Sequence, residues 1–150
     1  MITMSVDIGG EDGTGVVIYD GEVKKIMVSH TFNTRAKGEG VLDFAVETAG
    51  WAFRYAPDLI ITAIPTAHRS TIARHFEKIG ALRIIAHQHG AQFQTVIDSN
   101  CKLLVLGDGG ALKLAIQKHY EKFKKLKTEH ERDAFMFIEA VQTGKAKSKN

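Results

Sequence analysis

Asp7 has the residue type and the position expected of a metal ligand at the end of a buried strand. It lies in residues 1–10, where apolar and polar residues alternate, and Gly9-Gly10 follow it closely. An ionised carboxylate in an apolar strand needs a paired cation or a metal. The two glycines allow a ligand to approach the backbone. The alternative interpretation is a structural acid that is hydrogen-bonded at a strand end, and Asp7 alone does not decide between the two.

A histidine and an aspartate near the C-terminus are candidates for the same site. His130 and Asp133 are three residues apart, so they share one face of a helix, which continues through the apolar residues Ala134 and Phe137. We therefore expect both side chains to point toward the sheet that carries Asp7. Oxygen ligands with one imidazole favour magnesium or manganese. Alternatively, the pair serves only the start of the helix and faces solvent.

Lysine residues mark a third candidate region. Lys102 and Lys113 flank a glycine loop, residues 107–110, that can grip a phosphodiester or simply connect two helices. The net charge of +3 is modest, but further lysines are clustered, which suits a phosphate backbone. These clusters are Lys118, Lys122, Lys124, Lys125 and Lys127, and then Lys145, Lys147 and Lys149. The alternative is a solvated helix face with a disordered terminus.

The spacing of apolar residues predicts the elements that position these side chains. Strands are predicted at residues 1–10, 13–19, 22–32, 58–64 and 93–97, and helices at residues 39–55, 67–89, 100–106, 111–125 and 128–143. Asp20-Gly21 predicts a two-residue hairpin turn, and Thr128 with Glu131 predicts a capping box. This order predicts an α/β fold with a mixed five-stranded sheet, three strands antiparallel and then two parallel, and helices on both faces.

Composition restricts the class of protein. The chain has 150 residues, of which 44% are hydrophobic and 25% charged, as in a soluble globular domain. We expect one domain at residues 1–143 and a basic flexible tail at residues 144–150. No apolar run approaches the ~20 residues that cross a bilayer, so no membrane partner is expected. The single cysteine, Cys101, predicts a reducing compartment: a cytoplasmic protein, or a viral protein that acts in the host cytoplasm.

Four motifs, taken in order, resemble the RuvC-type Holliday junction resolvases of the ribonuclease H-like superfamily. They are Asp7-Ile8-Gly9 with Thr14-Gly15-Val16-Val17, then Pro57-Asp58 before an apolar strand, then Lys102 with Gly107-Asp108-Gly109-Gly110-Ala111-Leu112-Lys113, and finally His130-Glu131-Arg132-Asp133-Ala134. Together they extend over residues 2–142. The resemblance implies a ribonuclease H-like fold and an endonuclease that resolves four-way DNA junctions in recombination and repair.

The resemblance also implies roles for particular residues. Asp7, His130 and Asp133 are expected to bind two divalent ions per site, Mg²⁺ or Mn²⁺, that promote in-line hydrolysis. Lys102 and Lys113 are expected to contact the scissile strand, where Lys113 adds positive charge during catalysis. The family acts as a homodimer on branched DNA. An apolar stripe in residues 67–89 (Ile72, Phe76, Ile84 and Ile85) is either the dimer contact or intramolecular core.

One position departs from the family pattern. Ala63 stands where the family carries a catalytic glutamate, and alanine cannot bridge two metals. Either the substitution was made to trap a complex, or the chain naturally lacks this ligand, or the true match is shifted by one or two residues. Thr66 also replaces an aromatic residue that some relatives use as a wedge. His68 or Arg69 is then expected to contact the DNA junction instead.

Two other functions fit parts of the sequence. A catalytically silent protein of the same fold would bind branched DNA without cutting it, and restoring glutamate at Ala63 discriminates it from the nuclease. The segment Asp7-Ile8-Gly9-Gly10 also resembles the first phosphate loop of the actin and sugar-kinase superfamily. That superfamily needs a second phosphate loop and a second, related domain, for which we expect 150 residues to leave no room.

Overall fold

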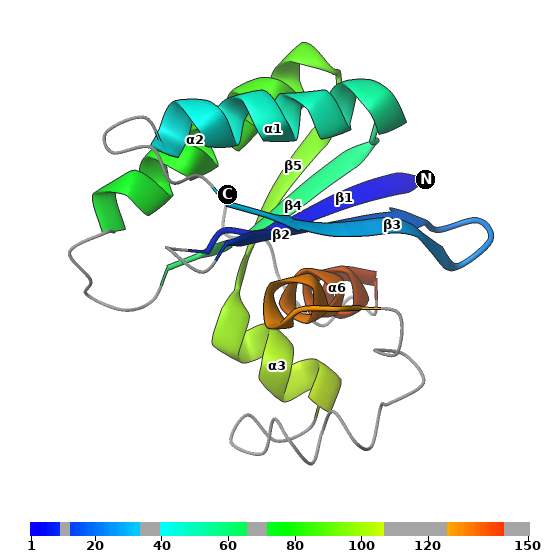
Figure 1. Ribbon diagram of the computed structural model, residues 1–150. Coiled ribbons are helices and arrows are strands. Elements are labelled where there is room, and N and C mark those ends of the chain that lie inside the picture. Colours follow the sequence, from blue (N-terminus) through cyan, green and yellow to red (C-terminus); the bar gives the residue numbers. More distant parts are fainter. Residues whose placement is uncertain (10–12, 34–39, 66–71, 107–125, 143–150) are drawn as a thin grey trace.

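The computed structural model describes residues 1–9, 13–33, 40–65, 72–106 and 126–142 (Figure 1). The elements are β1 (Ile2–Asp7), β2 (Thr14–Asp20), β3 (Lys25–Phe32), α1 (Gly40–Tyr55), β4 (Leu59–Ile64), α2 (Ile72–Gln88), β5 (Gln92–Ile97), α3 (Asp98–Leu106) and α6 (Glu129–Gln142). The predicted loop at 107–110, the predicted helix at 111–125 and the predicted tail lie outside these residues. No helix of the described ranges is long and apolar enough to span a bilayer.

The five strands form one mixed sheet in the order β3-β2-β1-β4-β5. β1, β2 and β3 are antiparallel neighbours, whereas β4 runs parallel to β1 and β5 runs parallel to β4. The predicted fold class is therefore confirmed, including the change from antiparallel to parallel pairing. β1 occupies the centre of the sheet, as its apolar alternation predicts, and Met4, Ser5 and Val6 are fully buried.

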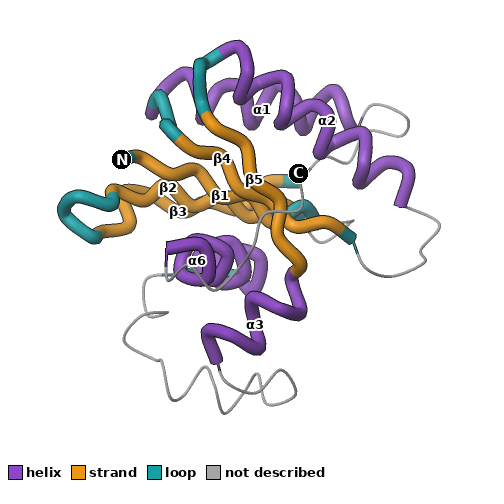
Figure 2. Tube along the Cα trace, turned by 180° about the vertical axis from the view of Figure 1, so that it is seen from behind, coloured by secondary structure: helices purple, strands orange, loops and turns teal. Residues whose placement is uncertain are grey.

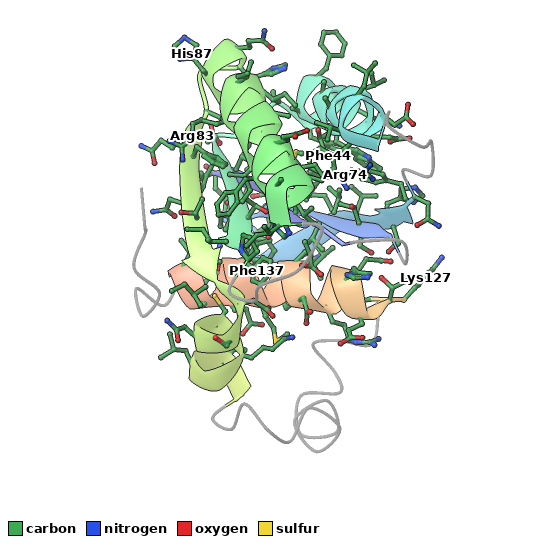
Figure 3. The ribbon with its side chains drawn as sticks, turned by 90° about the vertical axis from the view of Figure 1, so that its left-hand side faces the viewer. Phe44, Arg74, Arg83, His87, Lys127 and Phe137 are labelled. Atoms are coloured by element: carbon green, nitrogen blue, oxygen red, sulfur yellow. The ribbon has the colours of Figure 1, made fainter. Side chains whose placement is uncertain are left out.

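Helices cover both faces of the sheet. α1 and α2 lie on one face, and α6, with α3 beside it, lies on the other (Figures 1 and 2). The sheet thus separates two cores: Phe44 packs in the core under α1 and α2, and Phe137 packs in the core under α6 (Figure 3). Val6 belongs to the α1–α2 side, so the alternation of β1 turns Asp7 toward α6.

Three parallel strands carry the candidate site at their carboxyl ends. Val6 on β1 pairs with Thr62 on β4, and Ala63 pairs with Val96 on β5. Asp7 is the last residue of β1, and Asp98 follows β5 directly as the first residue of α3. Since parallel strands end at the same edge of a sheet, these positions gather where α/β proteins commonly bind ligands.

The hairpin turn between β2 and β3 differs from its prediction. β2 extends through Asp20, and four residues, Gly21 to Lys24, form the turn before β3 begins at Lys25. The Asp20 carboxylate accepts a hydrogen bond from the backbone N–H of Glu22 at 2.9 Å, and Lys24 adopts a φ of 55°. Side-chain bonding to the turn backbone therefore replaces the two-residue turn that Asp20-Gly21 predicts.

Candidate functional site

A network of hydroxyl and carboxylate groups fixes the start of α6 on the sheet. Thr128 caps the helix as predicted, because its hydroxyl oxygen accepts a hydrogen bond from the backbone N–H of Glu131 at 3.2 Å. The Glu131 carboxylate accepts hydrogen bonds from the hydroxyls of Thr128 (3.0 Å) and of Thr31 on β3 (2.7 Å). These bonds hold the pKa of Glu131 below its usual value although burial opposes them. The cap thereby ties the first turn of α6 to β3.

A glycine on β2 allows this helix start to approach the sheet closely. A β-carbon at Gly15 would overlap the backbone of His130 and lie 2.7 Å from the amide nitrogen of Glu131. Gly15 pairs with Asp7 in the register of β1 and β2. The Thr14-Gly15 motif therefore has a steric reason: only glycine leaves room for α6 above the strand end that carries Asp7.

Asp7 and His130 come together from opposite ends of the chain. The His130 Nδ1 atom lies 2.7 Å from Asp7 Oδ2, and the two side chains are only 18% and 15% exposed. Burial raises the pKa of Asp7 above its usual value, an effect that His130 opposes and the charge of Asp98 increases. The predicted convergence of β1 and α6 is thus present in the structure, with the imidazole oriented by the carboxylate.

Asp133 lies one helical turn further along α6, in an ion-paired cluster. Its side chain is 9% exposed, and its Oδ2 atom lies 3.3 Å from the Nζ atom of Lys102. The same ammonium lies 3.1 Å from Oδ2 of Asp98. Burial and the negative charge of Asp7 raise the pKa of Asp133 to about 7, against the opposing charge of Lys102. Burial alone would lower the pKa of Lys102, but Asp133 and Asp98 together raise it.

Two carboxylate oxygens of this cluster are buried without a partner. Among the described residues, neither Oδ1 of Asp98 nor Oδ1 of Asp133 has a hydrogen-bond partner. Burying a carboxylate oxygen without a partner destabilises the fold, and carboxylate oxygens are the ligands that Mg²⁺ and Mn²⁺ prefer. The residues therefore fit a divalent cation chemically. In the present arrangement, no three histidine, cysteine or carboxylate side chains of the described ranges are close enough to hold one ion.

Position 63 contributes no carboxylate to the cluster. Ala63 is 7% exposed, belongs to the core on the α6 side and lies one position beyond the Val6–Thr62 pair, beside Asp7. Its neighbour Thr62 donates its hydroxyl to the Val6 carbonyl at 2.7 Å. No acid occurs anywhere in β4, so a shift of one or two residues does not supply the missing glutamate.

Asp98 also lies in the candidate site, where the sequence did not predict it. The predicted helix began at residue 100, whereas α3 begins at Asp98, directly after β5. The available signal was an acid at a strand end, four residues before Lys102, which is the spacing of a helical ion pair. Lys102 itself lies inside the acidic cluster. Of the other predicted DNA contacts, Lys113, His68 and Arg69 lie outside the described residues.

Comparisons with known proteins support the fold but come from structures alone. No protein-family model matches the sequence, and no curated protein sequence matches it. The structure is similar to Thermus thermophilus RuvC, with a TM-score of 0.76, 16% sequence identity and 99% of each chain covered. It is similarly close to T. thermophilus RuvC in complex with a Holliday junction substrate, with a TM-score of 0.76 and 15% identity over 99% of each chain.

A viral structure shows the same likeness at lower similarity. Fowlpox virus resolvase, in complex with its substrate Holliday junction DNA, has a TM-score of 0.59 and 17% identity, with 95% of this chain and 98% of that chain covered. At these identities the likeness shows the fold. The chain thus has the fold of the Holliday junction resolvases, as the four sequence motifs predicted.

Proposed function

We propose that this chain, which has the resolvase fold, is a divalent-metal-dependent endonuclease that resolves four-way or other branched DNA. The observation that carries the proposal is the meeting of Asp7 with His130, at 2.7 Å, beside a buried Asp133. Two segments separated by more than one hundred residues bring an imidazole and carboxylates to one edge of the sheet. Burial and the charge of Asp7 raise the pKa of Asp133, and perturbed carboxylates of this kind are enriched at functional sites.

The proposed roles follow from the positions of the side chains. Asp7, His130 and Asp133 would hold Mg²⁺ or Mn²⁺, with two ions per site. When bound, such ions activate a water molecule and stabilise the leaving oxygen in an in-line displacement. Asp7 orients the His130 imidazole through their hydrogen bond. Lys102 brings a positive charge to the place where a phosphodiester would lie, and with Lys113 it is proposed to contact the cut strand.

Positive charge near the site is consistent with a DNA partner. Lys127 is exposed directly before α6 and points away from the body of the protein (Figure 3). The further lysines at 113, 118, 122, 124 and 125 precede it in the sequence. Since lysine contacts to phosphate release bound counterions, we expect junction binding to depend steeply on salt. We propose that this binding occurs in the cytoplasm.

A combined binding and cleavage assay tests the proposed function. The native chain is incubated with four-way, three-way and linear DNA, with Mg²⁺ or with EDTA. We expect preferential binding of the four-way junction, symmetrical cleavage only with Mg²⁺, and a loss of affinity of ~10²-fold or more between 50 and 200 mM salt. Equal binding of all three DNAs with a flat salt response would contradict the proposal.

A silent junction-binding protein is the second candidate, and Ala63 is the observation that favours it. With alanine at the end of β4, the chain lacks one carboxylate of the family site. Tight junction binding without any cleavage, either by the native chain or by Ala63→Glu, would establish this second function. Cleavage by the native chain at a rate comparable with that of Ala63→Glu would exclude it.

We propose further that the protein acts as a homodimer through α2. Of the predicted apolar stripe, Ile85 is only 5% exposed and serves the intramolecular core, whereas Phe76 and Ile84 are 49% and 60% exposed. Ile84 also lines an apolar groove between α1 and α2 together with Val46, which is 67% exposed. The stripe therefore divides into Ile85, which stabilises the monomer, Ile72, which is partly buried, and two residues, Phe76 and Ile84, that are available for a second copy.

Light scattering tests this arrangement. We expect the native chain to have the mass of a dimer and Ile84→Asp to be a folded monomer, because a buried unpaired carboxylate costs several kcal/mol. Val23→Asp is the matched control, since Val23 is equally exposed (60%) but lies in the β2–β3 turn. A dimer of unchanged affinity in Ile84→Asp would exclude α2 as the interface.

A further inference from the structure

Compared with the family pattern, the cluster at the edge of the sheet lacks one carboxylate and contains another that the pattern does not include. The acid is missing at Ala63, the fifth residue of β4. The additional acid is Asp98, which follows the last residue of the adjacent strand, β5. Ala63 pairs with Val96, so Asp98 lies two residues beyond the partner of the position that lacks the acid. The additional acid, Asp98, and the position that lacks an acid, Ala63, are therefore neighbours in space.

Both positions face the same side of the sheet. Ala63 and Val96 belong to the core on the α6 side. Asp98, the first residue of α3, follows β5 directly, and its carboxylate lies on the α6 side because it shares Lys102 with Asp133 of α6. There its Oδ2 atom lies 3.1 Å from Lys102 Nζ, while Asp133 Oδ2 lies 3.3 Å from the same ammonium. Asp98 and Asp133 thus already share one positive charge between β5 and α6.

A second observation supports a ligand in this cluster, because two of its carboxylate oxygens are buried without a hydrogen-bond partner among the described residues. The Asp133 side chain is only 9% exposed, and its Oδ1 atom has no hydrogen-bond partner among the described residues. Oδ1 of Asp98 is also covered and has no partner among the described residues, although the Asp98 side chain as a whole is 36% exposed. A purely structural ion pair with Lys102 would leave these two oxygens at a cost that a bound divalent cation removes.

We infer that Asp98 supplies, from the end of β5, the carboxylate that position 63 lacks, and that it binds a divalent cation together with Asp133. This inference rests on the proposed function. Lys102 holds the two carboxylates in place when no divalent ion is bound. A cation bound by these two carboxylates would replace the Lys102 ammonium as their partner, and the ammonium would then be available to a DNA phosphate. The site would thus have as many carboxylates as the family pattern, with Asp98 after β5 in place of a glutamate at position 63 on β4.

Manganese binding to the full chain, followed by electron paramagnetic resonance without DNA, tests this inference. We expect Asp98→Asn to weaken Mn²⁺ binding by about tenfold or more, as the loss of a ligand does. Asparagine is isosteric, so the fold is retained, which circular dichroism checks. Glu47→Gln is the control, because Glu47 is an exposed acid on α1, across the sheet from the site. It should bind Mn²⁺ like the native chain.

The double variant separates a ligand from a residue that merely positions Lys102. In a Lys102→Met background, Asp98→Asn should still weaken Mn²⁺ binding if Asp98 is a ligand. If Asp98 acts only through Lys102, Asp98→Asn will have no further effect in that background, and the inference is wrong.

The same measurement distinguishes a failure of the Asp98 inference from a failure of the proposed nuclease function. Unchanged Mn²⁺ affinity in Asp98→Asn, with loss in Asp7→Asn, would overturn the role of Asp98 and leave the nuclease proposal intact. A native chain that binds no Mn²⁺ would overturn both.

Discussion

Asp7→Asn is expected to abolish Mg²⁺-dependent junction cleavage while junction affinity stays within about twofold of the native value. The amide removes the charge that a cation site needs, yet it retains the shape of the carboxylate and can still hydrogen-bond His130. Loss of several kcal/mol of transition-state stabilisation corresponds to a rate reduction of roughly 10³-fold or more. Binding persists because phosphate contacts and cation ligation use different groups. Single-turnover cleavage and gel-shift titration measure the two effects separately.

The control for Asp7→Asn is again Glu47→Gln, which removes an equal charge from exposed α1. It should cleave at the native rate. Asp7→Asn should also be no less stable than the native protein, because burial raises the pKa of Asp7 and its charge raises that of Asp133. Cleavage by Asp7→Asn within tenfold of the native rate would remove Asp7 from the proposed site.

Gly15→Ala is expected to lower the free energy of unfolding by about 1–3 kcal/mol or more, the usual cost of inserting a carbon into a packed interface. The new β-carbon would overlap the His130 backbone, so α6 must move away from β2. That shift would also separate His130 from Asp7 and reduce cleavage. Urea denaturation measures the loss of stability, and the cleavage assay measures the loss of the site.

Gly50→Ala provides a matched control for this steric effect. Gly50 lies within α1, and a β-carbon there meets no atom within 4 Å. Because alanine favours helix over glycine by about 1 kcal/mol, the same substitution should stabilise the protein at this position. The two glycine substitutions are thus predicted to have opposite signs. Equal and small effects at both positions would show that α6 does not depend on close contact with β2.

Much of the fold follows from periodicity in the sequence. Alternation in β1 predicted a central strand, and the β1–β3 meander followed by helix-linked β4 and β5 predicted the change to parallel pairing. The cap at Thr128 was also predictable, because its residues are local. The turn after Asp20 was not, since its side chain bonds the turn backbone and lengthens the turn by two residues.

The candidate site was predictable in part. Helical spacing placed His130 and Asp133 on one face, and the structure brings His130 to Asp7. Asp98 could not be found in this way, because its importance depends on the register between β4 and β5 and on the long-range approach of α6. The position of Lys102 between two carboxylates depends on the same tertiary contacts. The four-residue spacing of Asp98 and Lys102 was a local signal for their ion pair, but only tertiary contacts bring this pair to Asp133.

The cluster also carries a cost to stability that the proposed function would explain. Burial and the charge of Asp98 raise the pKa of Asp7, and burial with the charges of Asp7 and Asp98 raises the pKa of Asp133, while Lys102 opposes both effects. A sequence selected for stability alone would replace such a group with apolar side chains. Retention of three carboxylates around one ammonium is therefore expected where a cation or a phosphate must bind.

Anomalous X-ray diffraction from crystals of the native chain soaked in Mn²⁺ tests the cation site most directly. We predict an anomalous peak within about 2–3 Å of carboxylate oxygens of Asp133 and of Asp7 or Asp98, at the carboxyl ends of β1 and β5. An anomalous map without a peak at these carboxylates, in crystals where the strand ends and the start of α6 are open to solvent, would contradict the proposed site.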